Sequence, residues 1–209
     1  IGAQPPVLLT FPDGKLGDYL SDRTLLARLT DQIGVEIARL RPDVVITWGP
    51  DGGTGHPDHR LVSNIATQLM RTGAPGMPER LFYMSFPENM YTLTPGRTAA
   101  PLFYPQPQYF TMKVPFTPAD LSAAQTAMAC HKTQFNPEQL PVIQSGLARL
   151  WNGVIAFIPA VSSWSGNDLF AEKPQDVDRL AARTAAKARV DALIESFKKV
   201  VPANATVAA

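Results

Sequence analysis

The chain has 209 residues, of which 45% are hydrophobic, so it is long enough to bury one hydrophobic core. Its 19 basic and 18 acidic residues nearly cancel, and no Lys/Arg cluster suggests binding to nucleic acid or to a membrane surface. No apolar run approaches the roughly 20 residues of a transmembrane helix, and the single cysteine, Cys130, excludes an internal disulfide and a zinc site built from cysteine pairs.

The N-terminal half is predicted to alternate strands and helices. An apolar, β-rich run at residues 7–11 ends in a Pro-Asp-Gly turn and predicts a buried strand. Ser21 can cap the helix that follows, in which apolar residues recur at helical spacing until Pro42 ends it. Residues 43–47 predict a second buried strand, and after its Gly-rich loop another helix begins at about His56. This order and spacing predict parallel βαβ units.

The C-terminal half continues the pattern with shorter elements. They are predicted strands at 80–86, 109–116 and 154–158, and predicted helices at 121–131 and 137–151. Residues 87–107 are proline-rich and predict a long surface loop, and an alanine-rich pattern predicts a C-terminal surface helix at 174–201. We therefore expect residues 1–209 to form one α/β domain with a Rossmann-like, mostly parallel sheet flanked by helices.

The loop after the second predicted strand carries the strongest candidate site. It ends in the motif HPDH at residues 56–59, which holds two of the three histidines of the chain. Ligands of open parallel α/β sheets bind beyond the carboxyl ends of the strands, where this loop lies. His56 and His59 share a face if the helix begins near His56, and the positive end of the helix dipole disfavours protonated histidine. Since neutral imidazole is the form that binds metals, the sequence favours a metal site.

Two other interpretations of this loop are possible. Asp and His are also common in a polar helix cap, in which Asp58 would be an ordinary carboxylate at the start of the helix. The segment from Gly53 also begins like a G-x-G-x-x-G nucleotide loop, but Asp58 stands at the last glycine position and no lysine follows. A nucleotide site is therefore disfavoured, while the helix cap stays open.

Residues 50–59, PDGGTGHPDH, resemble the second signature of the zinc-dependent de-N-acetylases of the LmbE/PIG-L family. Two shorter segments resemble elements of the same family in the same order, FPDGKL at residues 11–16 and HKTQ at residues 131–134. The resemblance covers most of residues 1–135 and is looser beyond them. It implies a hydrolase that uses Zn²⁺ to remove the N-acetyl group from a glucosamine-type sugar or sugar conjugate.

The resemblance also implies roles for the residues of the HPDH motif. His59 would be a zinc ligand, and zinc lowers the pKa of a bound water to roughly 7. A carboxylate would accept the proton of this water as it attacks the amide. His56 would stabilise the oxyanion and protonate the leaving amine, and Asp58 would orient His56.

Further residues are candidates for substrate contacts. Asp13 would lie near substrate hydroxyls, although an ordinary Asp-Gly turn explains it equally well. His131 and Gln134 extend the apolar stripe of their predicted helix, so we expect both to point inward, Gln134 as a substrate contact and His131 as a hydrogen-bonded core residue. Thr54 stands where some family members have a tyrosine that helps to hold the oxyanion, which leaves the substrate open. Cys130 is predicted to be a small buried hydrophobe.

Family members begin with a strand that ends in a His-Pro-Asp-Asp-Glu motif, which supplies two zinc ligands and the general base. This motif does not occur in the 209 residues. The resemblance therefore implies that an N-terminal βαβ portion of the same protein lies upstream of Ile1. It also implies that the present chain by itself binds zinc weakly and has no deacetylase activity.

Three functions follow from these observations. The first is the zinc-dependent deacetylase, whose partners would be a small sugar or glycoconjugate and the upstream segment. The second is a non-catalytic carbohydrate-binding or scaffold protein of the same fold that has lost the metal. The third is a metal hydrolase that acts on another amide. The sequence leaves open the cellular compartment and whether the chain forms a homo-oligomer.

Overall fold

The computed structural model describes residues 2–86, 105–161, 164–171, 184–185, 187–192 and 194–196, with Thr54 described by its backbone alone. They belong to two compact units, residues 1–171 and 172–209, each of which is described by itself. The prediction that residues 1–209 form one domain stays a prediction. Most of the surface loop predicted at 87–107 lies outside the described residues.

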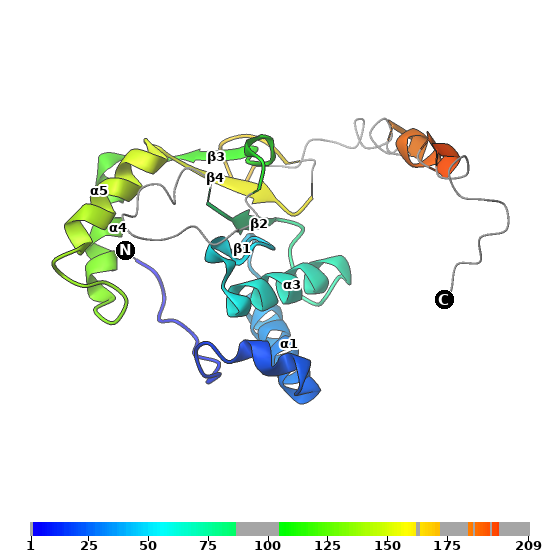
Figure 1. The fold of residues 1–209 in the computed structure, drawn as a ribbon, viewed down its shortest axis with the longest axis horizontal. Helices are drawn as coiled ribbons and strands as arrows, with labels where there is room; N and C mark the ends of the chain where they lie inside the picture. The colour runs from blue at the N-terminus through cyan, green and yellow to red at the C-terminus, as the bar shows by residue number, and fades with distance from the viewer. Residues whose placement is uncertain are drawn as a thin grey trace. The chain divides into compact units, whose positions relative to one another are not determined.

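The first unit contains a four-stranded sheet with the strand order β1-β2-β4-β3 (Figure 1). Its strands are β1 (Val45–Trp48), β2 (Leu81–Met84), β3 (Met112–Pro115) and β4 (Val154–Pro159). β1 and β2 pair in parallel, whereas β4 pairs antiparallel with both β2 and β3. Three strands thus point the same way and β4 is reversed. The predicted α/β fold is confirmed, with parallel pairing confined to β1 and β2 among the described strands.

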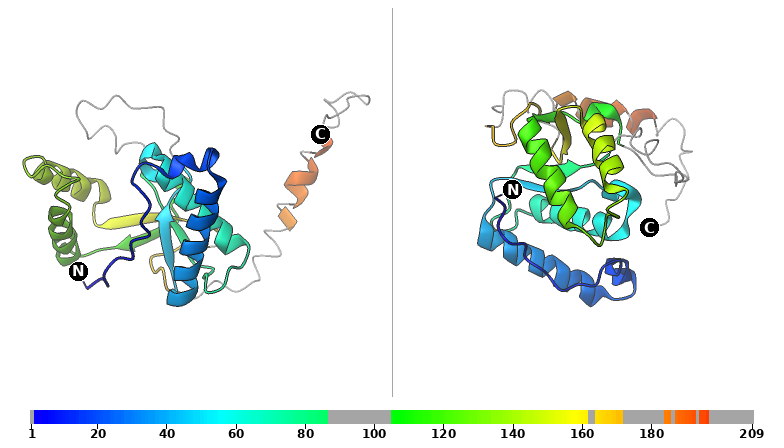
Figure 2. Two further views of the ribbon diagram at one scale, coloured as in Figure 1. Left: turned by 90° about the horizontal axis from the view of Figure 1, so that it is seen from below. Right: turned by 90° about the vertical axis from the view of Figure 1, so that its left-hand side faces the viewer.

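Helices α1 (Arg23–Leu40) and α3 (Pro57–Arg71) lie on one side of the sheet. α3 packs against β1 and β2, and α1 packs on α3, with the blue α1 outermost in the right view of Figure 2. Their shared core cluster contains Leu16, Leu25, Leu29, Leu61 and Ile65. Ala66 joins α3 to Leu81 of β2 in a further cluster. Shorter helical segments are η1 (Leu16–Leu20), α2 (Gly52–Gly55) and η3 (Pro107–Tyr109).

β2 is buried on both faces of the sheet. Leu81 and Tyr83 pack with α3 on one face, whereas Phe82 packs with Met112 and Trp164 on the other. Successive side chains of a strand point to opposite faces, so this alternation requires apolar residues at consecutive positions. The packing on both faces holds β2 in place, and it therefore also fixes the position of the residues that directly follow β2.

The limits of α1 follow from its sequence. Asp22, one residue after the predicted cap Ser21, accepts hydrogen bonds from two backbone N–H groups of the first turn. The hydroxyl of Thr24 also donates to the Asp22 carboxylate and lowers the pKa of that carboxyl. At the other end Arg41 adopts a left-handed conformation with a φ of 46°. Pro42 follows it, and because proline disfavours the α-helical conformation in the residue before it, the helix ends here.

Residues 7–11 do not form the predicted strand. Val7 and Leu8 are 50% and 80% exposed, whereas Leu9 and Phe11 pack against the cluster between α1 and α3. A strand needs a neighbour with which it can exchange backbone hydrogen bonds, and within the described part of the chain the sheet contains only β1 to β4. The apolar side chains of this segment therefore bury partly against helices instead.

Helices α4 (Pro118–Cys130) and α5 (Leu140–Trp151) connect β3 to β4 and pack against each other. Neither helix contains a fully buried residue. The expectation that His131 and Gln134 point inward is wrong, because the helix ends before both of them and both are exposed. Cys130 is also exposed, so its predicted burial is wrong as well.

The second unit contains a surface helix within the predicted range 174–201. All of its described residues between 184 and 196 are helical and exposed. Lys187 and Asp191 form an ion pair with a distance of 2.7 Å between Nζ and Oδ2, an i,i+4 spacing that supports exposed helices. Among the described residues no helix has the length and apolarity to cross a membrane.

The packing of α1 on α3 predicts unequal effects of two leucine substitutions in α1. Leu29 is 3% exposed and Leu40 is 58% exposed. We expect Leu29→Ala to lower the free energy of unfolding by about 2–5 kcal/mol, because it leaves a cavity between the helices. Leu40→Ala is the control and should change it by less than about 0.5 kcal/mol. Equal midpoints of the two variants in urea would contradict this packing.

Candidate active site

The candidate site lies where β1 and β2 end side by side. The parallel register pairs Trp48 with Met84, and the next residues, Gly49 and Ser85, continue from these ends. The N–H of Gly49 donates to the carbonyl of Met84 at 2.9 Å. The Gly-rich loop that follows β1 is therefore attached to β2 at its first residue, and α2 and α3 follow directly (Figure 1).

His56 caps α3 with its own side chain. Its Nδ1 accepts a hydrogen bond from the backbone N–H of Asp58 at 3.2 Å. Pro57 occupies the first helical position, where no backbone N–H is needed. Because Nδ1 is an acceptor here, the neutral imidazole of His56 carries its proton on Nε2. His56 therefore presents an N–H donor at its outer nitrogen.

In His59 the ring nitrogen Nδ1 has the opposite hydrogen-bond role. Its Nδ1 lies 3.0 Å from the carbonyl oxygen of Gly52, and a carbonyl can only accept, so Nδ1 carries the proton. This leaves the lone pair of the neutral ring on Nε2, which is the arrangement of a metal-binding histidine. The ring stacks on Trp48 with centroids 4.6 Å apart and an interplanar angle of 6°. The centroid of the His56 ring lies 4.8 Å away.

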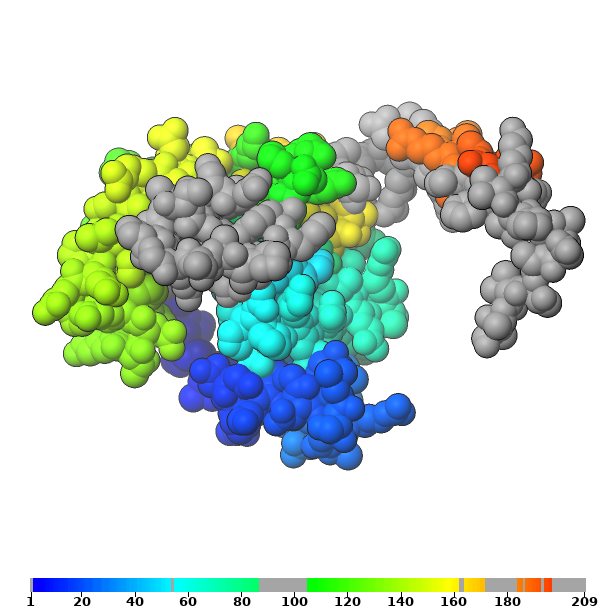
Figure 3. All heavy atoms as spheres, in the orientation of Figure 1, coloured from blue at the N-terminus to red at the C-terminus, as the bar shows by residue number. Residues whose placement is uncertain are grey.

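Asp58 does not hold His56 in the way that the family resemblance implies. Its carboxylate, which is 9% exposed, accepts hydrogen bonds from the N–H groups of Gly14 at 2.8 Å and Leu16 at 3.1 Å. The contact with His56 is made by the backbone N–H of Asp58 instead. Asp58 thus joins the start of α3 to the loop before η1, and Figure 3 shows these blue and cyan segments in contact.

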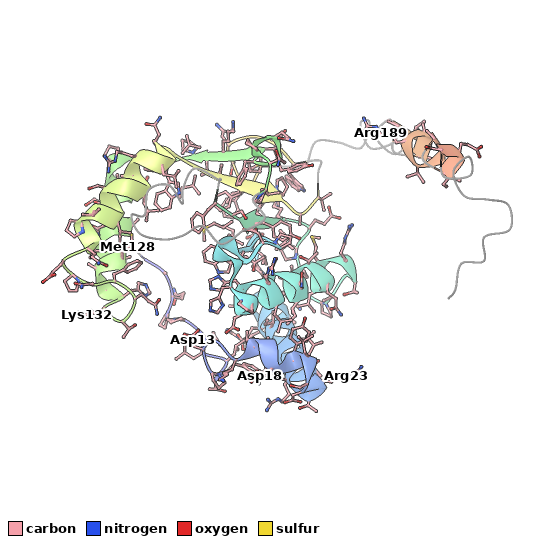
Figure 4. All side chains as sticks on the ribbon, viewed as in Figure 1. Asp13, Asp18, Arg23, Met128, Lys132 and Arg189 are labelled. Atoms are coloured by element: carbon pink, nitrogen blue, oxygen red, sulfur yellow. The ribbon has the colours of Figure 1, made fainter. Side chains whose placement is uncertain are left out.

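Of the remaining predicted site residues, some lie near the two histidines and others do not. Asp13 is exposed in the turn before Gly14, beside the start of α3. The backbone of Thr54 lies in α2. Gln134 is exposed in the turn after α4, and Figure 4 shows its neighbour Lys132 apart from the loop that carries Asp13. The structure therefore brings His56, Asp58, His59 and the Asp13 loop together, but it gives Gln134 no described contact with them.

Two buried polar residues in this region were not singled out from the sequence. Asp51 and Ser85 are 6% and 5% exposed. The hydroxyl of Ser85 donates to Oδ1 of Asp51, and Oδ2 of Asp51 accepts from the N–H of Gly53 at 2.9 Å. A Cβ at Gly49 would lie 2.7 Å from the Ser85 Oγ and closer still to the Asp51 carboxylate. Glycine at this position therefore makes room for the pair.

A cavity of about 310 Å³ adjoins the end of β2. Ser85 and Phe86, which follow β2, line it together with apolar residues of α5 and β4 such as Trp151 and Ile155. The ring of Phe86 lies 5.7 Å from that of Trp48. Since Trp48 stacks on His59, the cavity lies near the loop that carries His56 and His59. Its volume is at the lower end of the ~300–1,000 Å³ that is typical of small-molecule sites.

The donor set for a metal is incomplete within the described residues. They contain no group of three or more His, Cys, Asp or Glu side chains that could hold a metal ion. A catalytic zinc normally takes three protein ligands. His59 is suited to be one of them because of its free Nε2 lone pair, whereas His56 in its N–H form is suited to donate a hydrogen bond.

Comparisons with known proteins agree with the motifs of this site. Residues 1–70 match the family model described as PIG-L, GlcNAc-PI de-N-acetylase. A 1D-myo-inositol 2-acetamido-2-deoxy-alpha-D-glucopyranoside deacetylase of Corynebacterium urealyticum is 28% identical over 118 residues, which cover 50% of this chain and 35% of that protein. The protein of the same name from Corynebacterium jeikeium is 30% identical over 135 residues, which cover 53% and 40%. The chain thus spans less than half the length of these relatives.

The contacts of Asp58 predict a loss of stability that is independent of catalysis. Asp58→Ala leaves the N–H groups of Gly14 and Leu16 without their acceptor, so we expect the free energy of unfolding to fall by about 1–3 kcal/mol. The same two amides should exchange their hydrogens faster in NMR spectra. Asp13→Ala, at an exposed position in the same loop, is the control and should be nearly neutral. Unchanged exchange in Asp58→Ala would contradict the anchoring role of Asp58.

Proposed function

We propose that this chain, which belongs to the PIG-L family of de-N-acetylases, forms part of a site that hydrolyses the N-acetyl group of a glucosamine-type sugar or sugar conjugate. The relatives that it matches are named as deacetylases of a 2-acetamido-2-deoxy-glucopyranoside. The proposal extends this chemistry, an N-acetyl group on a sugar ring, to the present chain. It leaves open the group to which the sugar is attached.

The observation that carries the proposal is the opposite hydrogen-bond role of Nδ1 in two adjacent imidazoles. His56 uses its Nδ1 as an acceptor and presents Nε2–H, while His59 uses its Nδ1 as a donor and presents an Nε2 lone pair. Amide hydrolysis by a metal hydrolase needs both kinds of group, a ligand for the metal and a donor for the developing oxyanion. A plain helix cap explains the bond of His56 but not that of His59 to Gly52.

In this proposal His59 is one ligand of Zn²⁺. Bound zinc would supply Lewis-acid polarisation of the amide carbonyl and would acidify a water molecule. The family resemblance assigns the other two ligands and the general base to a His-Pro-Asp-Asp-Glu motif. Trp48, stacked on His59, and the Gly52 carbonyl limit the rotation of the ring.

His56 in turn acts on the reacting amide. Its Nε2–H can donate a hydrogen bond to the oxyanion that forms when water attacks the carbonyl. Because Nδ1 already accepts the Asp58 N–H, the ring keeps this proton, and the leaving amine takes the proton that the general base accepted from the water. The Asp58 backbone N–H on Nδ1 keeps the ring in the required tautomer. The Asp58 carboxylate contributes indirectly, because it fixes the loop next to the start of α3.

Substrate contacts are proposed for residues around these histidines. Asp13, held beside the start of α3 through Gly14, is a candidate for a sugar hydroxyl. Thr54 in α2 is a candidate for the reacting acyl group. The exposed position of Gln134 after α4 gives no support to its proposed contact.

The three histidines provide a test with an internal control. In the complete protein, His59→Ala should remove most of the bound zinc, whereas His56→Ala should keep the zinc and lower kcat by about 10²–10³. His131→Ala, at an exposed position after α4, should change neither. Zinc is measured by mass spectrometry of the metal, and turnover by the release of acetate from an N-acetylglucosamine conjugate.

Two results would contradict the proposal. Equal loss of zinc in the His56 and His59 variants would mean that the two histidines have the same role. A complete protein that binds the sugar conjugate but neither zinc nor any other metal would be the non-catalytic carbohydrate-binding protein of the same fold.

A further inference from the structure

A chain of hydrogen bonds runs from the end of β2 to the ring of His59. The hydroxyl of Ser85 donates to the Asp51 carboxylate, which also accepts the N–H of Gly53. The preceding carbonyl, that of Gly52, accepts from Nδ1 of His59 at 3.0 Å. The Gly52–Gly53 peptide group therefore links the two side chains: its carbonyl accepts from His59, and its N–H donates to the buried carboxylate of Asp51.

This carboxylate is in an environment where it must be held by partners. Asp51 and Ser85 are 6% and 5% exposed, and a buried polar side chain is costly unless it is hydrogen-bonded. They are 34 positions apart in sequence, so the contact joins the loop after β1 to the residue after β2. It therefore fixes the loop relative to the sheet and does not merely close a local turn.

The two glycines after Asp51 explain why the loop needs this side-chain contact to hold its conformation. Gly52 and Gly53 have φ angles of 75° and 68°, and glycine pays the largest entropy cost when it is fixed in one conformation. Neither residue has a side chain that could hold the loop in place. The N–H of Gly52 donates to the Gly49 carbonyl at 2.8 Å, and the Gly52–Gly53 peptide group is held from its other side by the bond of the Gly53 N–H to the Asp51 carboxylate.

We propose that Asp51 and Ser85 are positioning residues for His59. They hold the Gly52 carbonyl against Nδ1 of His59, so that the ring keeps its proton on Nδ1 and its lone pair on Nε2. This inference rests on the proposed role of His59 as a metal ligand. Neither residue touches the metal or the substrate in this proposal, and both act through the loop backbone.

The test uses four variants of the complete protein. Ser85→Ala removes the donor, and Asp51→Ala removes the acceptor of both bonds. Asp51→Asn is the conservative variant, since its amide oxygen can still accept from Gly53 and its amide nitrogen can donate to Ser85. Ser63→Ala is the matched control, because the Ser63 hydroxyl is also buried but has no hydrogen-bond partner within the described part of the chain.

Two readouts are followed in each variant, namely the ¹⁵N shifts of the His59 ring in the zinc-free protein and the dissociation constant of zinc. We expect a protonated Nδ1 in the wild type and in Ser63→Ala. Ser85→Ala and Asp51→Ala should show a mixture of tautomers and zinc binding weakened by about 10–100-fold, the usual range for residues that orient a metal ligand. Asp51→Asn should lie closer to the wild type than Asp51→Ala.

The outcomes separate this inference from the proposed function. A wild-type tautomer and wild-type zinc affinity in Ser85→Ala would overturn the positioning role and leave His59 as a ligand. A proton on Nε2 of His59 in the wild type would overturn the assignment of His59 itself. If an alanine variant does not fold, Ser85→Cys, which keeps the shape but is a weak donor, should show the same mixed tautomers, and an unchanged tautomer there would overturn the inference.

Discussion

The parallel pairing of β1 with β2 is the constraint on which the candidate site depends. Because these two strands run in the same direction and in register from Val45 to Trp48, their carboxyl ends lie at the same edge of the sheet. The loop with both histidines leaves from one end, and Ser85 leaves from the other. Polar groups far apart in sequence are thereby brought within hydrogen-bond distance, as the bond of Ser85 to Asp51 illustrates. An antiparallel arrangement would place these ends at opposite edges.

The start of α3 combines stability and chemistry in four consecutive residues. His56 caps the helix, Pro57 begins it, and Asp58 binds two amides of the loop before η1. His59 then faces back toward Gly52. The helix-cap and metal-site interpretations of this motif are therefore compatible, since the cap provides the geometry in which the two imidazoles differ. His56, Asp58 and His59 each bind a backbone group with their side chains, which fixes their own orientation.

The sequence predicts the elements better than their tertiary contacts. The Gly-rich loop and the proline after His56 mark the start of α3 correctly, because these signals are local. Residues 7–11 have strand propensity, but propensity does not reveal whether a neighbouring strand exists. The apolar spacing places Gln134 on a helical face, but the helix ends four residues earlier, at Cys130. Asp51 and Ser85 carry no local signal of their partnership, because a distance of 34 residues separates them and only the sheet register joins them.

The stacking of Trp48 on His59 makes the fluorescence of this tryptophan relevant to the site. The chain has three tryptophans, and the indole of Trp48 lies parallel to the His59 imidazole with the ring centroids 4.6 Å apart. Indole emission responds to charge and polarity in its immediate surroundings. We expect a cation that reaches the outer nitrogen of His59 to alter the intrinsic fluorescence of the protein, so that occupancy of the loop can be followed without a label and on the timescale of rapid mixing.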